Sequence, residues 1–489
     1  MQVVSIAKQR ASSNGARNDT NGSAQPSRAP AFERGDHVEL GLALLDALPS
    51  DAPIVADYGA LHTYSQSRGI WSKVERGAAS RTVQAFAGAS VGVEKPKSLR
   101  LRASDVHGAM ELAEDQASRP GFFDDATPGL AFDNGFVRLE GKAIRFVAHS
   151  PEHAARYAYP FEYASGAECP RWIECLRAAW RDDADVDAKI ACLQEFAGAS
   201  LLGLATKYQR AIVLYGVGAN AKSTIAKVIE AAFPPGSTSA VAPQSWGNEY
   251  RLAHLAGKLL NVVNELPETD ILAGETFKTV VTGEKTTARE IRQAPFDLCA
   301  RAGQLFAANR LPSTTDHSHG FWRRPLVLTF SRDFALSEQN ANIADEIIAA
   351  ELAGIVAWML AGAQRVIEQG RYTEPASSVA AVSDWKRGAD PIALFVEERT
   401  RKARTDAERT PAKALFTAYV EWAEANRFKV MSVTSFGLRM RAIGLPSEHT
   451  RDGKTYSVTL LRAGEQPDPA DEKYQDEERE GIRGEGGTS

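Results

Sequence analysis

Short apolar runs alternate with stretches of helical periodicity through the middle of the chain. The first run is rich in β-forming residues, and it leads through a glycine-rich turn into a helix-like segment. Three further runs follow, and the last of them ends at residue 330. Strand-like runs that alternate with helical segments are the pattern of an α/β layer, so we expect such a layer here. The runs cover residues 211–215, 258–263, 304–308 and 326–330.

Outside this layer the pattern defines flanking units. Before it, short strand-like runs and helical segments alternate, which predicts an α+β domain. After it, a long helical segment precedes a stretch rich in Ser, Ala, Gly and Pro, which predicts a helical lid and a linker. Both ends of the chain are polar without apolar periodicity, which is typical of disordered segments. The expected boundaries are 1–35 for an N-terminal arm, 36–204 for the α+β domain, 205–345 for the α/β core, 346–390 for the lid and linker, 391–465 for a C-terminal module and 466–489 for an acidic tail.

The C-terminal module shows helices followed by a hairpin. The hairpin is expected around the Asp452-Gly453 dipeptide, which is a strong turn signal. Three helices and a hairpin, with cations on the last helix and on the turn, predict a winged helix. A packing module between subunits is the alternative. The helices are expected at residues 391–398, 412–425 and 432–442, and the hairpin at residues 448–458.

The composition is that of a soluble globular protein. Of 489 residues, 44% are apolar and 24% are charged, which suffices for about three domains at roughly 150 residues each. The net charge of −5 excludes a global basic field, so any nucleic-acid surface must be local. We see no signal peptide, and no run reaches the roughly 18 apolar residues of a membrane span, so we expect a cytoplasmic protein without a membrane partner. The cysteines show neither a C-x-x-C pair nor zinc spacing, which indicates reduced thiols at Cys169, Cys175, Cys192 and Cys299.

The turn after residues 211–215 has the features of a phosphate-binding loop. In such loops successive backbone N–H groups wrap the phosphates, a lysine reaches the β- and γ-phosphates, and a hydroxyl binds Mg²⁺. We therefore expect ATP and Mg²⁺ as ligands, with Lys222 on the phosphates and Ser223 on the metal. The loop sequence is Gly216-Val217-Gly218-Ala219-Asn220-Ala221-Lys222-Ser223-Thr224.

One position of this loop departs from the usual pattern. The strict motif has glycine immediately before the lysine, and this chain has Ala221. A Cβ atom at a positive φ costs roughly 1–2 kcal/mol, so an alanine forced into that conformation is strained. We expect the substitution to affect turnover more than nucleotide binding.

Polar positions downstream offer the other groups that ATP hydrolysis needs. Glu265 follows the second apolar run, where an acid can hold Mg²⁺ through water and polarise the attacking water. Asn309 follows the third run and could orient that water, although alone it is a typical turn residue. Arg323 and Arg324 precede the fourth run and could supply charge to a neighbouring subunit, although an isolated pair is more often solvated. From Lys222 onward the intervals are 43, 44 and 14 residues, and this order favours a single ATPase site.

This order resembles the superfamily 3 helicases, and within them the phage and plasmid primase–helicase branch related to the poxvirus primase–helicase. The resemblance covers about residues 40–465. In the core it rests on the phosphate loop, Asn264-Glu265, Phe277-Lys278, Thr282-Gly283-Glu284, Ala288-Arg289-Glu290, Phe306-Ala307-Ala308-Asn309-Arg310-Leu311-Pro312 and Phe321-Trp322-Arg323-Arg324. Upstream it rests on Asn134-Gly135, Ser150-Pro151, Cys169-Pro170-Arg171-Trp172 and Leu193-Gln194-Glu195-Phe196-Ala197-Gly198.

The resemblance implies a P-loop NTPase core of the superfamily 3, AAA+-like type, with an N-terminal collar and a C-terminal winged helix. It implies that Glu265 is the catalytic acid and a Mg²⁺ ligand, and that Asn309 is the sensor. Arg323 or Arg324 becomes a finger that reaches across a subunit boundary, which implies a homo-oligomeric ring, usually a hexamer. Asn264 stands where many members carry a second acid. The nucleotide-binding residues would be Gly216, Gly218, Asn220, Ala221, Lys222, Ser223 and Thr224.

Two sets of cations are candidates for DNA contacts. In the resembled family, the region between the second and third runs leads into a hairpin that projects into the ring channel and grips DNA. Lys and Arg there would neutralise phosphates without reading sequence. Without the resemblance, a solvated surface is the simpler interpretation, because Glu284 and Glu290 balance the charge. The candidates are Lys285, Arg289 and Arg292 in this region, and Arg439, Arg441, Arg451 and Lys454 in the C-terminal module.

The sequence therefore predicts an ATP-dependent replicative DNA helicase of a phage, prophage or plasmid. The resemblance implies a ring that translocates 3′-to-5′ on single-stranded DNA and unwinds forked duplex DNA in a bacterial host. The alternative, which Ala221 motivates, is an ATP-gated origin-binding or replication-initiator protein with little unwinding. Primase activity has little support, because Asp183-Ala184-Asp185 lies in a polar stretch where a solvated acidic cluster is expected. Priming then falls to a separate primase or polymerase.

Overall fold

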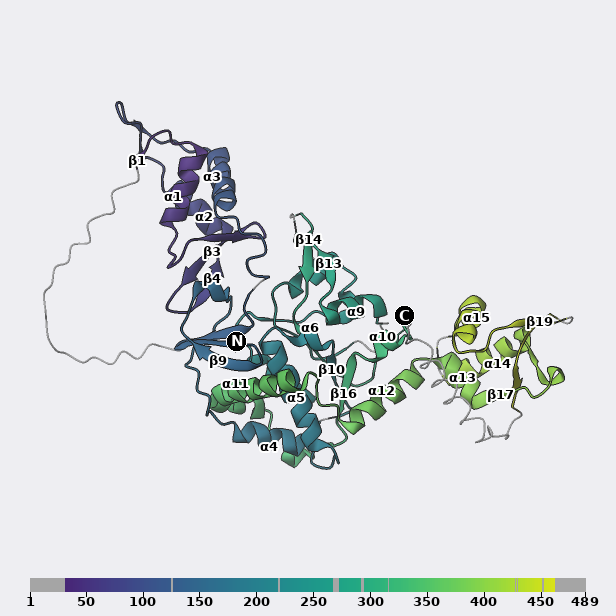
Figure 1. The fold of residues 1–489 in the computed structure, drawn as a ribbon. Helices are drawn as coiled ribbons and strands as arrows, with labels where there is room; N and C mark the ends of the chain where they lie inside the picture. The colour runs from purple at the N-terminus through teal and green to yellow at the C-terminus, as the bar shows by residue number, and fades with distance from the viewer. Residues whose placement is uncertain are drawn as a thin grey trace, which may run out of the picture. The chain divides into compact units, whose positions relative to one another are not determined.

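The computed structural model describes residues 31–124, 126–218, 220–266, 272–291, 294–314, 316–426, 428, 430–450 and 453–461. The predicted acidic tail and most of the predicted N-terminal arm lie outside these residues. The contacts divide the chain into two compact units. The first contains residues up to 63 together with 73–120, and the second contains residues 64–72 and those from 121 onward. Figure 1 follows the chain by colour from purple to yellow.

The first unit packs three helices with short strands. Asp36 caps the first helix, because its side chain accepts the amide of Glu39 at 3.0 Å. The first and third helices approach closely at Gly41, where a Cβ atom would lie 3.0 Å from the carbonyl oxygen of Ala109. The helices are α1 (His37–Ala47), α2 (Arg76–Gln84) and α3 (Ala103–Gln116). The strands that lie mainly in this unit are β1 (Ala31–Phe32), β2 (Val55–Asp57), β3 (Ala60–Ser65), β5 (Ser90–Val91) and β6 (Lys97–Ser98).

The second unit contains β4 (Ile70–Lys73) and then an antiparallel meander of three strands. Phe132 pairs with Gly135 across the first turn of the meander. Asn134 holds this turn, because its side-chain oxygen accepts the amide of Tyr163 at 2.8 Å. The meander strands are β7 (Gly129–Phe132), β8 (Gly135–Glu140) and β9 (Ala143–Val147). Helices α4 (Pro170–Ala179), α5 (Val186–Leu201) and α6 (Ala205–Tyr208) then precede the central sheet.

A five-stranded parallel sheet forms the centre of the second unit, and it confirms the predicted α/β layer. The strand order is β11-β12-β15-β10-β16. β10 lies inside the sheet, with Ala211 in register with Gln304 on one side and with Pro325 on the other. Because the strands are parallel, their carboxyl ends meet at one edge. The strands are β10 (Ala211–Tyr215), β11 (Thr238–Ser239), β12 (Leu260–Val263), β15 (Gly303–Ala308) and β16 (Pro325–Thr329).

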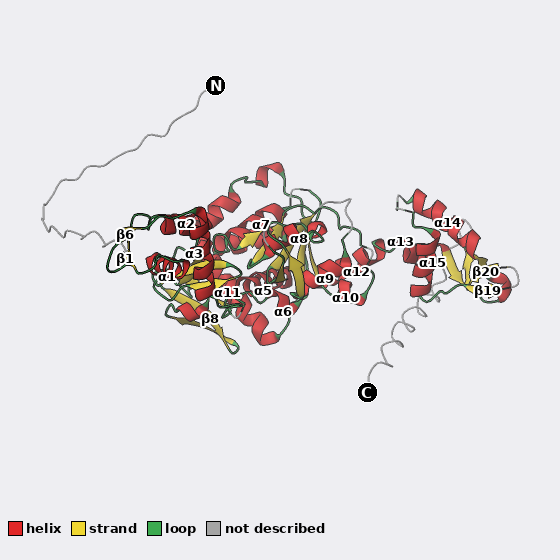
Figure 2. Ribbon diagram, turned by 90° about the horizontal axis from the view of Figure 1, so that it is seen from above, coloured by secondary structure: helices red, strands yellow, loops and turns green. Residues whose placement is uncertain are grey.

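Both faces of this sheet are covered, because successive side chains of β10 enter different cores. Ile212 and Leu214 lie in a core that also contains apolar side chains of α5 and two later helices, α7 and α11. Ala211 and Val213 lie in a second core, which includes Trp246. Figures 1 and 2 show helices around these strands. The helices of this region are α7 (Lys222–Ala231), α8 (Glu249–Leu252), α9 (Gly274–Thr282), α10 (His319–Trp322), α11 (Ile343–Gln369) and α12 (Ala376–Gly388).

The long helix α11 is part of this core. It has 27 residues, and its most apolar window has a mean hydropathy of 1.6, so by length and composition it could cross a membrane. One of its faces is buried against α5, and a Cβ atom at Gly198 of α5 would lie 2.0 Å from the carbonyl oxygen of Met359. Arg365 and the buried Glu195 join the two helices through an ion pair at 2.6 Å.

The stretch from residue 371 to 390, which composition marked as a linker, contains helix α12. This helix lies along β16, and the hydroxyl of Ser378 accepts the amide of Val327 at 2.9 Å. The indole of Trp385 is buried and donates to the carbonyl of Pro312 at 2.8 Å. Small residues that are common in linkers serve here to bring the helix close to the edge strand.

The C-terminal module has its own core, and it contains the three helices and the hairpin expected from the sequence. The rings of Phe395 and Tyr419 lie 5.7 Å apart, and those of Tyr419 and Phe436 lie 5.0 Å apart. The helices are α13 (Pro391–Arg399), α14 (Ala412–Ala425) and α15 (Val433–Ala442). The strands are β17 (Thr400–Lys402), β18 (Thr410–Pro411), β19 (Glu448–Thr450), β20 (Gly453–Tyr456) and β21 (Val458–Leu460), with β19 and β20 paired as the hairpin.

Replacement of Gly198 by alanine should destabilise the protein, because the added methyl group does not fit between α5 and α11. We expect Gly198→Ala to lower the free energy of unfolding by about 2 kcal/mol. Gly388→Ala is the matched control, since nothing lies within 4 Å of a Cβ atom at this end of α12. The control should stabilise the protein by up to about 1 kcal/mol. Thermal melts check both values, and equal shifts in the two variants would contradict the close packing.

Candidate active site

The loop after β10 lies at the carboxyl edge of the sheet, and α7 begins at Lys222. Glycine permits this path because two positions have no room for a side chain. A Cβ atom at Gly216 would lie 2.5 Å from the carbonyl oxygen of Phe330. Gly218 has a φ of +94°, in the left-handed region that favours glycine. Ala219 lies outside the described residues.

Ala221 has a φ of +67° and a ψ of 4°, so the backbone keeps the left-handed conformation that glycine adopts easily. This is the conformation expected from the sequence, and it costs roughly 1–2 kcal/mol for a residue with a Cβ atom. The side chain of Ala221 makes no capping hydrogen bond to α7. A strained residue therefore stands directly before the lysine of the loop.

The side chain of Lys222 is folded back onto the loop. Its ammonium group donates to the carbonyl of Gly216 at 2.5 Å and to the side-chain oxygen of Asn220 at 2.8 Å. Burial lowers the pKa of Lys222, and the carboxylate of Asp333 opposes that effect. Ser223 is exposed on the first turn of α7, and Thr224 beside it is half-buried. Phosphates are bound by an ammonium group and loop amides, and Mg²⁺ is bound by an exposed hydroxyl such as that of Ser223.

Glu265 and Asn309 lie at the same edge of the sheet as the loop. The amide of Gly216 donates to the carbonyl of Ala308 at 3.2 Å, directly before Asn309. The amide of Leu266, directly after Glu265, donates to the carbonyl of Ala307 at 2.9 Å. Both candidate side chains are exposed. The structure thus brings together the phosphate loop, the predicted acid and the predicted sensor.

The two arginines lie at the opposite edge of the sheet. The carbonyl of Arg324 accepts the amide of Ala211, the first residue of β10, at 2.9 Å. β10 has five residues, so it separates Arg324 from the phosphate loop by about 15 Å at roughly 3.3 Å per residue. Neither Arg323 nor Arg324 is therefore brought to the loop of its own chain.

The two arginines also differ in exposure. Arg323 is exposed, and its guanidinium donates to the side-chain oxygen of Gln209 at 2.7 Å. Arg324 is only 5% exposed, and it donates to the carbonyl of Gly320 in α10. Burial, together with the neighbouring Arg323, lowers the pKa of Arg324. Arg323 is the arginine that an adjoining molecule can reach.

A hairpin connects the predicted second and third motifs. It consists of β13 (Lys285–Ala288) and β14 (Phe296–Cys299), with Lys285 opposite Cys299 (Figure 1). Lys285 is exposed and forms an ion pair with Asp297 at 2.9 Å, which raises the pKa of Lys285. Arg289 is half-buried just beyond β13. Arg292 lies outside the described residues.

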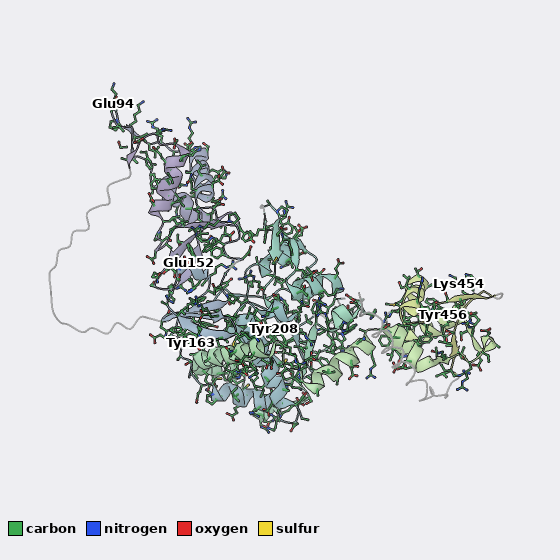
Figure 3. The ribbon with its side chains drawn as sticks, in the orientation of Figure 1. Glu94, Glu152, Tyr163, Tyr208, Lys454 and Tyr456 are labelled. Carbon is green, nitrogen blue, oxygen red and sulfur yellow. The ribbon has the colours of Figure 1, made fainter. Side chains whose placement is uncertain are left out.

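The predicted cations of the C-terminal module differ in availability. The guanidinium of Arg439 is committed to the buried carboxylate of Asp390, with Nε 2.8 Å from Oδ2. Asp390 also caps α13, so the geometry gives Arg439 a structural role and does not support its expected contact with DNA. Arg441 on α15 and Lys454 on β20 are exposed, and Figure 3 labels Lys454. Arg451 lies outside the described residues.

Asp183 and Asp185, expected as a solvated acidic cluster, are partly buried around a cation. The ammonium group of the fully buried Lys189 donates to Asp183 at 2.7 Å and to the hydroxyl and carbonyl of Thr329, each at 2.8 Å. Asp185 accepts the amide of Ser377 at 2.7 Å. The expectation of solvation was wrong, because an interior lysine needs these acceptors. The cluster ties the end of β16 to the start of α5.

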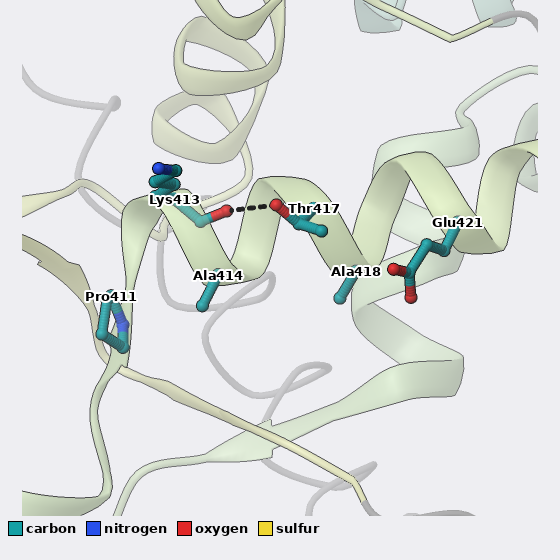
Figure 4. Close-up of a pocket in the computed structure, with 6 residues that line it drawn as sticks. All are labelled: Pro411, Lys413, Ala414, Thr417, Ala418 and Glu421. Atoms are coloured by element: carbon teal, nitrogen blue, oxygen red, sulfur yellow. Dashed lines mark hydrogen bonds between the residues drawn. The ribbon is translucent and has the colours of Figure 1, made fainter.

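Other surfaces offer less to an active site. In the C-terminal module, α14 lines an open groove of about 530 Å³ with Ala414 and Ala418 in its wall, and Figure 4 shows that none of the predicted site residues lines it. Among the described residues, no group of three or more His, Cys, Asp or Glu side chains could hold a metal ion. Mg²⁺ bound through phosphates and water needs only one or two protein ligands, which Ser223 and Glu265 fit.

Two residues near these groups were not found from the sequence. Gln209 contacts Arg323, and Asp333 contacts the phosphate loop at Gly218. Gln209 has a left-handed backbone with a φ of +55° at the end of α6, which a propensity analysis does not anticipate. Asp333 lies four residues beyond β16. Its position near the loop can be recognised only when β16 is known to pair with β10.

Relief of the strain at residue 221 should stabilise the protein in the absence of nucleotide. We expect Ala221→Gly to raise the free energy of unfolding by about 1 kcal/mol, because glycine adopts positive φ without steric cost. Ala231→Gly in the last turn of the same helix should lower it by about 1 kcal/mol, because its backbone is helical. Denaturant titration of both variants measures the difference. A loss of stability in both would show that residue 221 is not strained.

Comparison with known families agrees with the motifs. Residues 43–181 match the family described as D5 N terminal like, and residues 214–324 match a family of unknown function, DUF5906. The second match begins in β10 and ends at Arg324, so it spans the loop, Glu265, Asn309 and the arginines. A search of the curated proteins gave no significant match.

Solved structures give weaker likenesses. The apo C-terminal region of NrS-1 is 12% identical, with a TM-score of 0.43 over 88% of this chain and 100% of that chain. A structure of its residues 305–718 is 12% identical, with a TM-score of 0.36 over 67% of this chain and 94% of that one. A structure of JCV helicase with a bound acetamide compound is 12% identical, with a TM-score of 0.23 over 45% of this chain and 67% of that chain. Likenesses at this level establish neither fold nor function.

The D5-like region therefore precedes a second matched stretch, and this stretch carries every predicted ATPase motif at the ends of the strands of one parallel sheet. The D5-like region and the ATPase motifs follow one another in the order that we expected from the sequence. These matches support a likeness to the phage primase–helicase family.

Proposed function

We propose that this protein is an ATP-driven DNA helicase that works as a ring during phage or plasmid replication. The family match supports a replication helicase-type function. The observation that carries the proposal is the division of the ATPase groups between the two edges of one sheet. The loop, Glu265 and Asn309 lie at the carboxyl edge, and Arg323 lies at the amino edge.

At the carboxyl edge, each group has a separate task. Loop amides and Lys222 would bind the phosphates of ATP, once the ammonium group exchanges Asn220 and Gly216 for phosphate oxygens. Ser223 would bind Mg²⁺, and Glu265 would polarise the attacking water. Asn309 would hold that water in line, since its amide follows the strand between β10 and β12.

At the amino edge, Arg323 would act on the nucleotide of a neighbouring subunit. A separation of about 15 Å along β10 prevents it from serving its own site. An arginine supplied by a neighbour makes hydrolysis depend on assembly, and a closed ring gives every site such a neighbour. We therefore propose a homo-oligomeric ring, with a hexamer as the expected size. Arg324, which is buried, would support α10 and the position of Arg323.

DNA would contact two surfaces. The β13–β14 hairpin ends shortly before β15 begins, with Lys285 on β13 and Arg289 just beyond it, and it would grip the strand inside the ring. The C-terminal module, as a winged helix, would use Arg441 and Lys454. Priming would come from a separate primase or polymerase in the cytoplasm of a bacterial host.

A second candidate function is an ATP-gated replication initiator with little unwinding. The left-handed backbone of Ala221 favours it, because strain beside Lys222 can slow the adjustments that turnover needs. Unwinding of a forked duplex separates the two functions. A sluggish parent that gains unwinding with Ala221→Gly would favour the initiator, whereas a fast parent would favour the helicase.

Mixed rings test whether Arg323 acts across a subunit boundary. Lys222→Ala and Arg323→Ala should each reduce DNA-stimulated ATPase activity on the order of a hundredfold or more. Co-expressed in equal amounts, they should recover about a quarter of the wild-type rate, because one interface in four pairs an intact loop with an intact arginine. The control mixes Lys222→Ala with the Lys222→Ala/Arg323→Ala double variant, which should recover nothing. Mixed rings without recovery would contradict the proposal.

Single cation replacements test the C-terminal surface. Arg441→Ala and Lys454→Ala should each weaken binding to a labelled duplex a few-fold near 0.1 M salt and reduce the salt slope by about 1. Arg399→Ala removes an exposed cation at the end of α13, outside α15 and β20, and should change neither value. Fluorescence anisotropy over a salt series measures both. Equal effects of all three would show that the surface is not a specific DNA contact.

A further inference from the structure

The segment after β16 lies directly beside the phosphate loop. The amide of Phe330 donates to the carbonyl of Tyr215 at 2.7 Å, so the segment continues the pairing with β10 up to the start of the loop. The carbonyl of Phe330 faces Gly216, where it leaves no room for a Cβ atom. Residues that follow Phe330 are therefore held at the loop by the backbone itself.

Neighbours of Asp333 fix its position. Arg332 is 11% exposed in its side chain, and its guanidinium donates to the carbonyl of Ala178 and to Glu338, each at 2.7 Å. The same guanidinium lies 4.2 Å from the ring centre of Phe334. The hydroxyl of Ser331 donates to Asp183 at 2.8 Å. These contacts anchor the chain on both sides of Asp333 and hold its backbone beside the loop.

That carboxylate faces the middle of the phosphate loop. Its Oδ1 atom lies 2.5 Å from the position that a Cβ atom of Gly218 would take, so a side chain at residue 218 would make the carboxylate shift. Asp333 is exposed, which leaves its oxygens accessible to a ligand. A carboxylate accepts hydrogen bonds and repels phosphate, so its natural partner at this loop is a donor and not an anion.

The strand order indicates which part of a nucleotide would meet Asp333. Glu265 and Asn309 follow β12 and β15, on one side of β10, and the γ-phosphate must face them for hydrolysis. Asp333 follows β16, on the other side of β10. The nucleoside end of the ligand then extends toward β16. The donors that it carries there are the two ribose hydroxyls, which a carboxylate accepts in other nucleotide-binding folds.

We propose that Asp333 recognises the ribose of the bound nucleotide and selects ribonucleoside triphosphates over 2′-deoxyribonucleoside triphosphates. This inference rests on the proposed function of the loop. Selection of this kind suits an enzyme that works on DNA, where deoxynucleoside triphosphates are present as polymerase substrates. Gly218 contributes to this recognition, because a side chain at residue 218 would displace the carboxylate of Asp333.

Binding of ATP and 2′-deoxy-ATP to the full-length protein, measured by titration calorimetry with Mg²⁺, tests the proposal. We expect the wild type to bind ATP about tenfold more tightly than 2′-deoxy-ATP. This factor corresponds to the one hydrogen bond to a charged group that 2′-deoxy-ATP cannot make. Asp333→Ala should weaken ATP binding by about the same factor and abolish the preference. Asp345→Asn is the matched control, since it removes one charge near Lys227 of α7 and should keep the preference.

Other outcomes overturn the inference in distinguishable ways. If the wild type binds both nucleotides equally, or Asp333→Ala weakens both equally, the carboxylate does not read the ribose. If Asp333→Ala binds both more tightly, the carboxylate only repels phosphate. If the wild type binds neither nucleotide while its thermal melt is intact, the proposed function of the loop fails as well. Lys222→Ala, which should bind neither nucleotide, marks that baseline.

Discussion

Parallel pairing on both sides of β10 determines where every candidate ATPase group lies. At the carboxyl end of β10, one backbone bond joins the loop to the end of β15, and a second joins the segment after β12 to the end of β15; together they hold the loop, Asn309 and Glu265 at one edge. At its amino end, the bond from Ala211 holds Arg324 and the adjacent Arg323. An extended strand is stiff, so the two groups stay apart for as long as the sheet exists. In the proposed ring, the arginine of one subunit would meet the loop of the next.

Within the loop, polar contacts and strain oppose each other. Lys222 is nearly buried, and an unpaired ammonium group there would be costly, so Asn220 and Gly216 accept its hydrogen bonds. These contacts hold Lys222 at the first position of α7, immediately after the left-handed Ala221. A ligand must therefore offer Lys222 better acceptors than the loop does, and phosphate oxygens meet that condition because they are charged.

Much of this arrangement was predictable from sequence, because local patterns encode it. The strand–loop–helix around Lys222 and the helices of the C-terminal module have short-range signals, whereas the hairpin at Lys285 was expected from the family resemblance alone. The positions of Glu265 and Asn309 followed from their places after apolar runs. The left-handed backbone at residue 221 followed from a motif that normally has glycine there.

What the sequence did not reveal depends on long-range neighbours. Asp183 and Asp185 resembled solvated acids, because nothing local indicates that Lys189 is buried between them and Thr329. Arg439 resembled a DNA contact, because its partner Asp390 is 49 residues away. Asp333 became visible only when strand order put β16 beside β10. Side-chain partners of this kind depend on the topology of the fold, which the hydrophobic periodicity of the sequence does not predict.

The outer edge of β16 has a consequence for assembly. α12 lies along that edge, and Ser378 occupies the amide of Val327, so another strand cannot pair there and extend the sheet. Subunits that meet on this side must touch through side chains. Contacts of that kind can tilt and slide by small steps, whereas a sheet shared between subunits would have to break its hydrogen bonds. In the proposed ring, the covered edge would leave neighbouring subunits free to change their angle during each cycle.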